Sequence, residues 1–177
     1  MLVMLGLFPN LDRARRRLRR MWERGEIGFM RSVELPDGRR TLVYAKFQIT
    51  NPLHELQLTD VCLKVKADEI RRLHAVDQRF NADAEVVIDQ KVFYVELDRG
   101  TEGYAQVRKQ MKNYQDANAD VLWIVPTITR MNGMMKGTTS GNLWFTTYAQ
   151  SLTPHAEVWV NVHGEVAALP MPQGIDA

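Results

Sequence analysis

The sequence predicts an α/β (α+β) protein in which a small basic module precedes a larger domain of alternating helices and strands. Two observations predict this class: apolar residues recur at helical spacing in several segments, and short apolar runs bounded by turn residues separate those segments. With 177 residues, the chain suits one ordinary domain that carries a small appendage. Its hydrophobic content of 45% and charged content of 25% are those of a globular protein and argue against disorder.

The composition also limits the chemistry. Cys62 is the one cysteine, which excludes an internal disulfide framework and a cysteine-based zinc cage and is typical of a reducing compartment. The apolar opening at residues 1–8 is far shorter than the roughly 18 residues that a membrane span needs. We therefore expect a cytoplasmic protein that has no membrane partner.

Charge is distributed unevenly along the chain. Residues 1–46 hold 11 Lys/Arg against 5 Asp/Glu, whereas residues 47–177 hold 12 against 16. The positive N-terminal piece suits a polyanion, and the acidic remainder either solvates itself or gathers carboxylates around a metal. This asymmetry predicts two modules with different partners.

The first predicted element is a basic helix at about residues 11–23, for which Asn10 can serve as the N-cap. Its apolar stripe consists of Leu11, Ala14, Leu18, Met21 and Trp22. Arginines cover the other faces and continue just past its end: Arg13, Arg15, Arg16, Arg17, Arg19, Arg20 and Arg24.

A β-hairpin is predicted next, with strands at 27–35 and 39–47 around a Pro-Asp-Gly turn. Helix followed by hairpin is the back half of a winged helix-turn-helix, in which the helix enters a DNA groove and the wing crosses phosphates. The front half is missing, so the motif is degenerate or the chain starts late. The partner predicted for this module is DNA, bound with salt-sensitive affinity through Arg13, Arg16, Arg17, Arg20, Arg24, Arg39 and Arg40.

The Asn-Pro pair at residues 51–52 ends that module. We therefore predict a partial winged-helix module at 1–50, an α/β domain at 51–169 and a loose tail at 170–177.

Within the larger domain, the remaining elements follow from periodicity and turn signals. Helices are predicted at 59–73, capped by Thr59, and at 102–115, capped by Thr101. Strands are predicted at 84–88, 92–97, 121–125, 143–148, 157–162 and 165–169, with 121–125 as a central strand buried on both faces. The Gly- and Met-rich residues 131–141 are predicted to form a mobile loop, and the four tryptophans at 22, 123, 144 and 159 are expected in the core.

Three carboxylates are predicted to converge at one end of the second hairpin. A two-residue turn at Asp89-Gln90 makes cross-strand partners sum to 179, which pairs Asp83 with Glu96. Asp98 lies two residues beyond Glu96 and therefore on the same face. Like charges placed side by side persist most naturally where a cation such as Mg²⁺ or Mn²⁺ neutralises them, so this corner is a candidate metal site.

An alternative reading makes this corner structural. Asp83 and Asp98 are also ordinary residues for the start and end of a strand, and a one-residue slip of register would place Asp83 on the other face. Glu96 is harder to explain in this way, because the strand around it is apolar on both faces.

The run Phe-Tyr-Val-Glu-Leu-Asp-Arg-Gly-Thr-Glu at 93–102 resembles the replication-relaxation proteins of plasmids and other mobile elements, as do residues 81–84 and 109–114. Residues 54–61 are similar to the His-x-Leu segment that opens that family's second module. The arginine helix, with Tyr44 in the wing, is similar to its winged-helix module. The resemblance covers roughly residues 13–125.

This resemblance implies a mixed-sheet core related to the PD-(D/E)XK nucleases. In active members, two acids hold the metal and a lysine two residues after the second acid helps to orient or activate water. Asp83 would be the first acid and Glu96 the second. Ala82 stands where the motif has proline, and Asp98 stands where it has lysine. The second departure replaces a cation with an anion and argues against hydrolysis.

A lysine could be supplied from elsewhere in the chain. Lys91 is excluded because it lies at the far end of the hairpin and on the opposite face. Lys112 is better placed, since Gln110 and Tyr114 beside it have the Gln-x-x-x-Tyr spacing found in some nucleases of this superfamily. The alternative is that Lys109 and Lys112 are solvated and Tyr114 belongs to the core.

Two functions therefore remain open. The first is a DNA-associated protein of a mobile element, which acts in replication, relaxation or transfer or in their regulation, alongside other replication or transfer proteins, through a nuclease-like domain without catalysis. The second is a Mg²⁺- or Mn²⁺-dependent DNA endonuclease that uses Asp83, Glu96 and Asp98. A third interpretation, a module that forms a homodimer through its hydrophobic N-terminus, is compatible with either.

Overall fold

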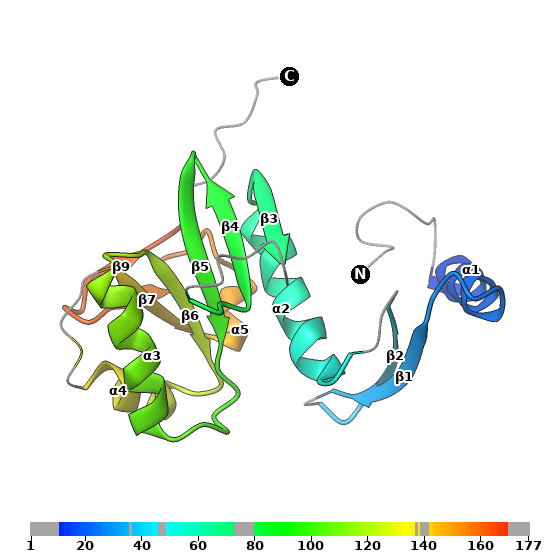
Figure 1. The fold of residues 1–177 in the computed structure, drawn as a ribbon, viewed down its shortest axis with the longest axis horizontal. Coiled ribbons are helices and arrows are strands. Elements are labelled where there is room, and N and C mark those ends of the chain that lie inside the picture. Colours follow the sequence, from blue (N-terminus) through cyan, green and yellow to red (C-terminus); the bar gives the residue numbers. More distant parts are fainter. Residues whose placement is uncertain are drawn as a thin grey trace. The chain divides into compact units, whose positions relative to one another are not determined.

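The structure, a computed structural model, describes residues 11–35, 37–45, 49–72, 80–136, 138 and 142–169. The chain divides into two compact units, Met1–Gln57 and Leu58–Ala177. Within the described residues there are five helices, one two-stranded sheet and one seven-stranded mixed sheet (Figure 1). The predicted mixture of helices and strands is therefore confirmed at the level of an α+β fold.

The first unit contains the predicted helix and hairpin. Helix α1 spans Leu11–Glu23, and strands β1 (Phe29–Glu34) and β2 (Arg40–Ala45) pair in antiparallel register. Its buried residues are Ala14, Ile27, Phe29 and Val33. Trp22 was expected in the core but is 42% exposed, because it lies at the edge of the apolar stripe of α1. The proposed cap Asn10 and the hairpin end at residues 46–47 lie outside the described residues.

Helix α2 differs from the prediction because it spans Pro52–Val65 and so begins seven residues before Thr59. The Asn51 side chain accepts a hydrogen bond from the His54 amide at 3.4 Å, and the proline at the first helical position needs no amide partner. The Asn-Pro pair, interpreted as a boundary, is thus a helix start. Strand β3 (Glu69–Arg72) occupies residues that were predicted to be helical.

The seven-stranded sheet has the order β3-β4-β5-β6-β7-β8-β9. The strands after β3 are β4 (Ala84–Ile88), β5 (Lys91–Leu97), β6 (Val121–Val125), β7 (Leu143–Thr147), β8 (Trp159–Asn161) and β9 (Val166–Ala167). The β5–β6 and β6–β7 pairs are parallel, and the other pairs are antiparallel. As predicted, β6 is central and each of its residues is buried.

Three further helices follow strands of this sheet: α3 (Tyr104–Asp116), α4 (Ile128–Met135) and α5 (Tyr148–Ser151). The N-cap of α3 is Gly103, so the expectation that Thr101 caps this helix was wrong. Helix α4 occupies part of the predicted mobile loop, because Thr127 caps it and Met134 is buried. Residues 137, 139–141 and the predicted tail at 170–177 lie outside the described part of the chain.

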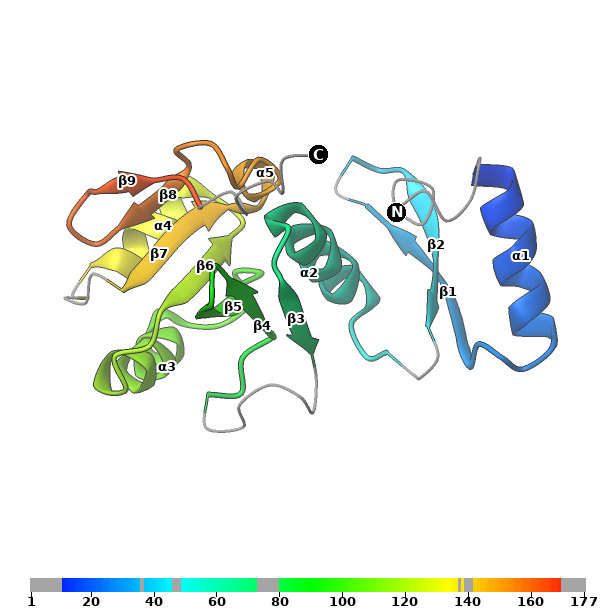
Figure 2. The same cartoon turned by 90° about the horizontal axis from the view of Figure 1, so that it is seen from above.

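Helices cover both faces of the sheet (Figure 2). One face packs against buried residues of α2, which are Leu58, Val61, Cys62 and Val65. The other face packs against Val107, Met111 and Tyr114 of α3 and Met134 of α4. Because side chains alternate along β5, this packing decides which of its residues face α3. In the described part of the chain, no helix combines the length and the apolar character that a bilayer span demands.

Candidate functional site

The register of the second hairpin brings Asp83 beside Glu96. Ile88 pairs with Lys91 and Ala84 with Val95, as the two-residue turn predicted. Asp89 and Gln90 both have positive φ values, of 49° and 66°, as the tight turn requires. Asp83 precedes β4, and its Oδ2 accepts a hydrogen bond from the Leu97 amide at 2.8 Å, which holds this carboxylate at the end of β5.

Glu96 is a buried carboxyl group held by helix α3. Its side chain points to the α3 face of the sheet, and the residue is 6% exposed. Glu96 Oε1 accepts hydrogen bonds from Gln110 Nε2 at 2.7 Å and from the Tyr114 hydroxyl. Gln110 and Tyr114 are four residues apart, so they lie one turn apart on the same helix face.

Burial raises the pKa of the Glu96 carboxyl well above its usual value, and the negative charge of Asp83 raises it further. The hydrogen bonds from Tyr114 and Gln110 oppose this shift, and Glu102 adds to it. The carboxyl therefore retains its proton to a higher pH than an exposed glutamate does.

Tyr114 is held in place by neighbouring rings. It stacks on Phe80 at a centroid distance of 4.9 Å and meets Trp123 edge-on at 6.1 Å. Burial and the charge of Glu96 raise the pKa of the Tyr114 hydroxyl, so this group remains a proton donor. Tyr114 therefore belongs to the core and also donates a hydrogen bond to Glu96. The two interpretations of this residue from the sequence are both compatible with its position.

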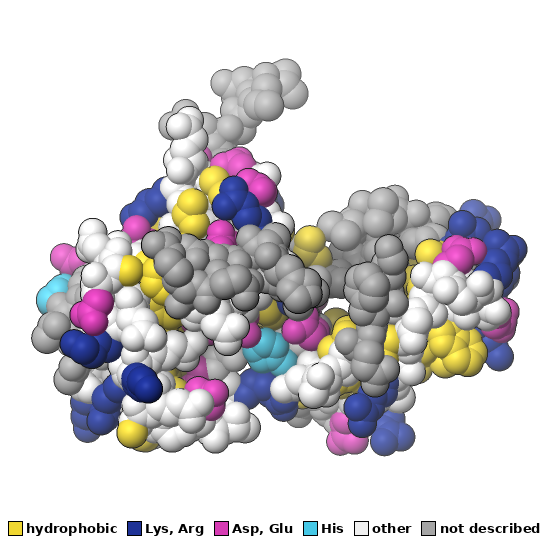
Figure 3. Space-filling model, viewed as in Figure 1, with side chains coloured by type: hydrophobic (Ala, Val, Ile, Leu, Met, Phe, Trp, Pro, Cys, Tyr) yellow, Lys and Arg dark blue, Asp and Glu magenta, His cyan; other side chains and the backbone are white. Residues whose placement is uncertain are grey.

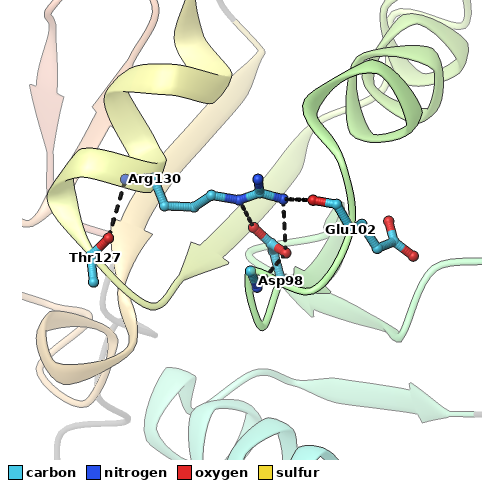
Figure 4. A network of polar contacts seen from close by, with 5 residues as sticks. Asp98, Glu102, Thr127 and Arg130 are labelled. Carbon is cyan, nitrogen blue, oxygen red and sulfur yellow. Dashed lines mark hydrogen bonds and ion pairs between the residues drawn. The ribbon is translucent and has the colours of Figure 1, made fainter.

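Asp98 is paired with Arg130 (Figure 4). Arg130 Nε donates to Asp98 Oδ2 at 2.6 Å, and Nη2 donates to Oδ1 at 3.3 Å. The Asp98 side chain is 5% exposed and that of Arg130 is 10% exposed. The guanidinium also donates to the Glu102 carbonyl at 2.8 Å and lies over the Tyr104 ring. Asp98 thereby joins the end of β5 to the first turn of α4.

The predicted convergence of Asp83, Glu96 and Asp98 is therefore not observed. Among the described residues, no group of three or more His, Cys, Asp and Glu side chains is placed to hold a metal ion. The reason is that β5 ends at Leu97, beyond which strand alternation no longer governs where a side chain goes, and that Arg130 engages Asp98. Sequence reasoning missed Arg130 because residues 131–141 were interpreted as a loop, so the helix that carries Arg130 was not predicted. Thr127, a capping residue two positions after the end of β6, was the available signal.

Lys112 does not join the carboxylates either. Its side chain is 72% exposed, and its ammonium group lies 3.7 Å from Asp116 on the same helix. Lys112 is two residues from both Gln110 and Tyr114, which rotates it about 200° around the helix from each of them. The interpretation of Lys112 as a solvated residue is the one that the structure favours.

Asp83 and Glu96 form the carboxylate pair of this corner. Magnesium is often bound through one or two carboxylates together with waters and substrate phosphates. Asp83 and Glu96 are the residues of this corner that could hold such an ion, since Asp98 is occupied by Arg130. Binding of such an ion would displace the proton of Glu96.

The predicted DNA-binding arginines are exposed on the first unit, where Lys and Arg side chains gather over α1 (Figure 3). Arg39 pairs with Asp37 at 2.6 Å and Arg40 lies 3.9 Å from Glu34, so the wing is partly neutralised. Arg24 lies 3.7 Å from Glu26. The remaining predicted contacts on the helix are Arg13, Arg16, Arg17 and Arg20, which are all exposed. Among the described residues, no acid pairs with Arg16, Arg17 or Arg20 of the helix, whereas both arginines of the wing lie near an acid.

No protein-family model matches the sequence, and no curated protein is a significant match to it.

Proposed function

We propose that this chain is a DNA-binding protein of a plasmid or another mobile element, with a nuclease-like domain that does not hydrolyse DNA. In this proposal the first unit is a partial winged helix and the second unit is related to the PD-(D/E)XK nucleases. The observation that carries the non-catalytic assignment is the Asp98–Arg130 pair two residues after Glu96.

Hydrolysis of a phosphodiester needs a cation near the attacking water and the transition-state charge. At the position of the nuclease lysine, this chain has a carboxylate. The guanidinium that contacts this carboxylate, that of Arg130, already donates to Asp98 and to the Glu102 carbonyl. Such a site would bind without cleaving.

The nuclease-like assignment is supported by the order of elements and by the contacts of Glu96. Helix α2, the β3–β4–β5 meander, helix α3 and strand β6 follow one another as in the proposed family. Gln110 and Tyr114 have the Gln-x-x-x-Tyr spacing, and both bond the second acid of the motif. The short sequence match is thus supported by a contact, because both of its residues donate hydrogen bonds to the same carboxyl group.

The DNA-binding assignment is supported by helix α1. Arg16, Arg17 and Arg20 are exposed, and Arg20 Nε bonds the Arg16 carbonyl at 3.4 Å without using any acid. Phosphate contacts of this kind give affinity with little base readout. We infer a role in replication, relaxation or transfer of the element or in their regulation, with other replication or transfer proteins or a second copy of the chain as protein partners.

The test of DNA binding compares the whole protein with the triple variant Arg16→Ala, Arg17→Ala, Arg20→Ala on a fluorescent duplex at several salt concentrations. Loss of three phosphate contacts should flatten the slope of log affinity against log salt by about 2.7. Arg19→Ala is the matched control, because Arg19 already pairs with Glu23 at 3.2 Å. Unchanged affinity and slope in the triple variant would refute this role for α1.

The test of catalysis incubates supercoiled plasmid with the protein and Mg²⁺ or Mn²⁺. We expect no nicking above that of Glu96→Ala.

A Mg²⁺- or Mn²⁺-dependent endonuclease is the second candidate function, and the adjacent acids Asp83 and Glu96 favour it. It predicts robust nicking of plasmid DNA that is lost in Glu96→Ala. That result would replace the non-catalytic assignment while leaving the DNA-binding role of α1 intact.

A further inference from the structure

Helix α3 carries three cations on its outer face. Arg108, Lys109 and Lys112 are exposed, whereas Val107, Met111 and Tyr114 are buried against the sheet. At 100° per residue, the three cations fall within about 100° of arc on the side away from the buried residues. Figure 3 shows Lys and Arg side chains on the surface over the region of α3 and α4.

These charges are weakly neutralised. Lys112 lies 3.7 Å from Asp116, a separation at which an exposed pair gains little. No carboxylate of the described residues pairs with Arg108 or Lys109. The outer face of α3 is therefore a local positive surface on a unit that is acidic as a whole, since residues 58–177 hold 12 Lys/Arg against 15 Asp/Glu.

An exposed aromatic ring extends this surface. Tyr104, in the first turn of α3, is 38% exposed and lies 5.8 Å from the Arg108 guanidinium and 4.5 Å from that of Arg130. The ring rests on α4 at Gly133, where a Cβ atom would collide with it. Tyr104 is thereby held beside the cations.

We propose that the outer face of α3 is a second binding surface for the phosphate groups of duplex DNA, formed by Arg108, Lys109 and Lys112 with Tyr104 at its edge. The inference rests on the proposed DNA-binding function and adds a site on the second unit. Charge complementarity selects the occupant: a duplex offers a regular row of phosphates, and α3 presents its three cations close together, within about 6 Å along the helix axis.

This surface is separate from the buried Glu96 carboxyl. Gln110 and Tyr114 direct the inner side of α3 toward Glu96, and the three cations are on the solvent side. DNA held by this face therefore does not need access to Glu96. The surface is an anchoring site.

The test uses the full chain and a fluorescent duplex, with affinity measured by anisotropy across a salt series. The triple variant Arg108→Ala, Lys109→Ala, Lys112→Ala should bind at least about tenfold more weakly at low salt and should lose about 2.7 from the salt slope. Alanine preserves helix propensity, and an unchanged melting temperature verifies the fold. The matched control is Lys64→Ala with Lys136→Ala, which removes two exposed cations from other elements.

Overturning results are an α3 variant that binds like the wild type, or one that loses no more affinity per charge than the control. Comparison with the Arg16, Arg17 and Arg20 variant separates the two proposals. If only the α1 variant weakens binding, the α3 surface is refuted and the proposed function stands. If only the α3 variant does, the α1 assignment fails and the α3 surface stands; a wild-type protein that binds no duplex refutes both.

Discussion

The carboxylate of Asp98 is bound by the guanidinium of Arg130, although the two residues are 32 positions apart in the chain. The pair joins the end of β5 to the first turn of α4, the helix that follows β6. Both side chains are nearly buried, so water screens their attraction only weakly. Each charge has lost much of its hydration, and the opposite charge of its partner compensates for that loss.

Removing both partners of this pair should therefore cost less stability than the sum of removing each one alone. We expect Asp98→Ala and Arg130→Ala each to lower the free energy of unfolding by about 3 kcal/mol, because each leaves a buried charge without its partner. The double variant should lose less than the sum of the two. Urea unfolding of the four proteins gives the coupling energy.

A matched control for this cycle is Arg130→Lys, which preserves the charge but loses the two-point contact and the planar stacking on Tyr104. It should fall between the wild type and Arg130→Ala. Strict additivity of the two alanine variants would show that the pair contributes no mutual stabilisation.

Glu96 should make the protein less stable as the pH rises. Its pKa is raised in the folded state, so the unfolded chain releases this proton first, from about pH 4.3 upward. Between that pH and the folded pKa, the folded state holds the extra proton, and stability falls with increasing pH. Above the folded pKa the loss is complete.

Glu96→Gln should remove this loss, because the amide oxygen still accepts from Tyr114 and Gln110 and the amide group carries no charge beside Asp83. We expect the variant to melt higher than the wild type near pH 8, by about 2–4 °C for each kcal/mol recovered, with a smaller difference near pH 4. Calorimetry across this range measures it. A constant difference at all pH values would assign the effect to packing and not to ionisation.

Local signals predicted the hairpin of β4 and β5 but not the segment before it. The two-residue turn determines the register, which is why the pairing of Ile88 with Lys91 could be derived. Strand β3 has no apolar alternation and an exposed Ile70, and its strand state depends on pairing with β4, which lies beyond an intervening segment. Strand preference of this kind comes from context and not from the residues themselves.

The candidate site was predicted to a similar extent. Glu96 was detectable because a charge in an otherwise apolar strand needs a partner, and the partners Gln110 and Tyr114 lay at a recognisable spacing. The Asp98–Arg130 pair was not detectable from the sequence, since no spacing rule connects residues on separate elements. Once a strand ends, the positions of its following side chains depend on what packs against them.

Gly133 should tolerate alanine only when Tyr104 is absent. A Cβ atom at Gly133 would collide with the Tyr104 ring, although glycine costs a helix about 1 kcal/mol relative to alanine. We expect Gly133→Ala to be more favourable by at least about 1 kcal/mol in the Tyr104→Ala background than in the wild type. Denaturant unfolding of the four proteins tests this. Equal effects in both backgrounds would mean that the ring moves aside without cost.

Titration with Mg²⁺ or Mn²⁺ should raise the melting temperature through Asp83 and Glu96. A ligand that binds the folded state at about one hundred times its dissociation constant stabilises it by about 2.7 kcal/mol, which corresponds to about 5–10 °C in a chain of this size. Binding displaces the Glu96 proton, so the shift at a given cation concentration should be larger at pH 8 than at pH 6.

Variants distinguish which carboxylates respond to the cation. Asp83→Asn and Glu96→Gln should each abolish the shift, whereas Asp98→Asn should retain it despite a lower starting temperature, because Asp98 is engaged by Arg130 and not by a cation. A response that disappears in Asp98→Asn would restore the three-carboxylate site that the sequence predicted. If the wild-type protein shows no response at millimolar cation, Asp83 and Glu96 do not form a cation site, and the raised pKa of the buried Glu96 affects only the pH dependence of stability.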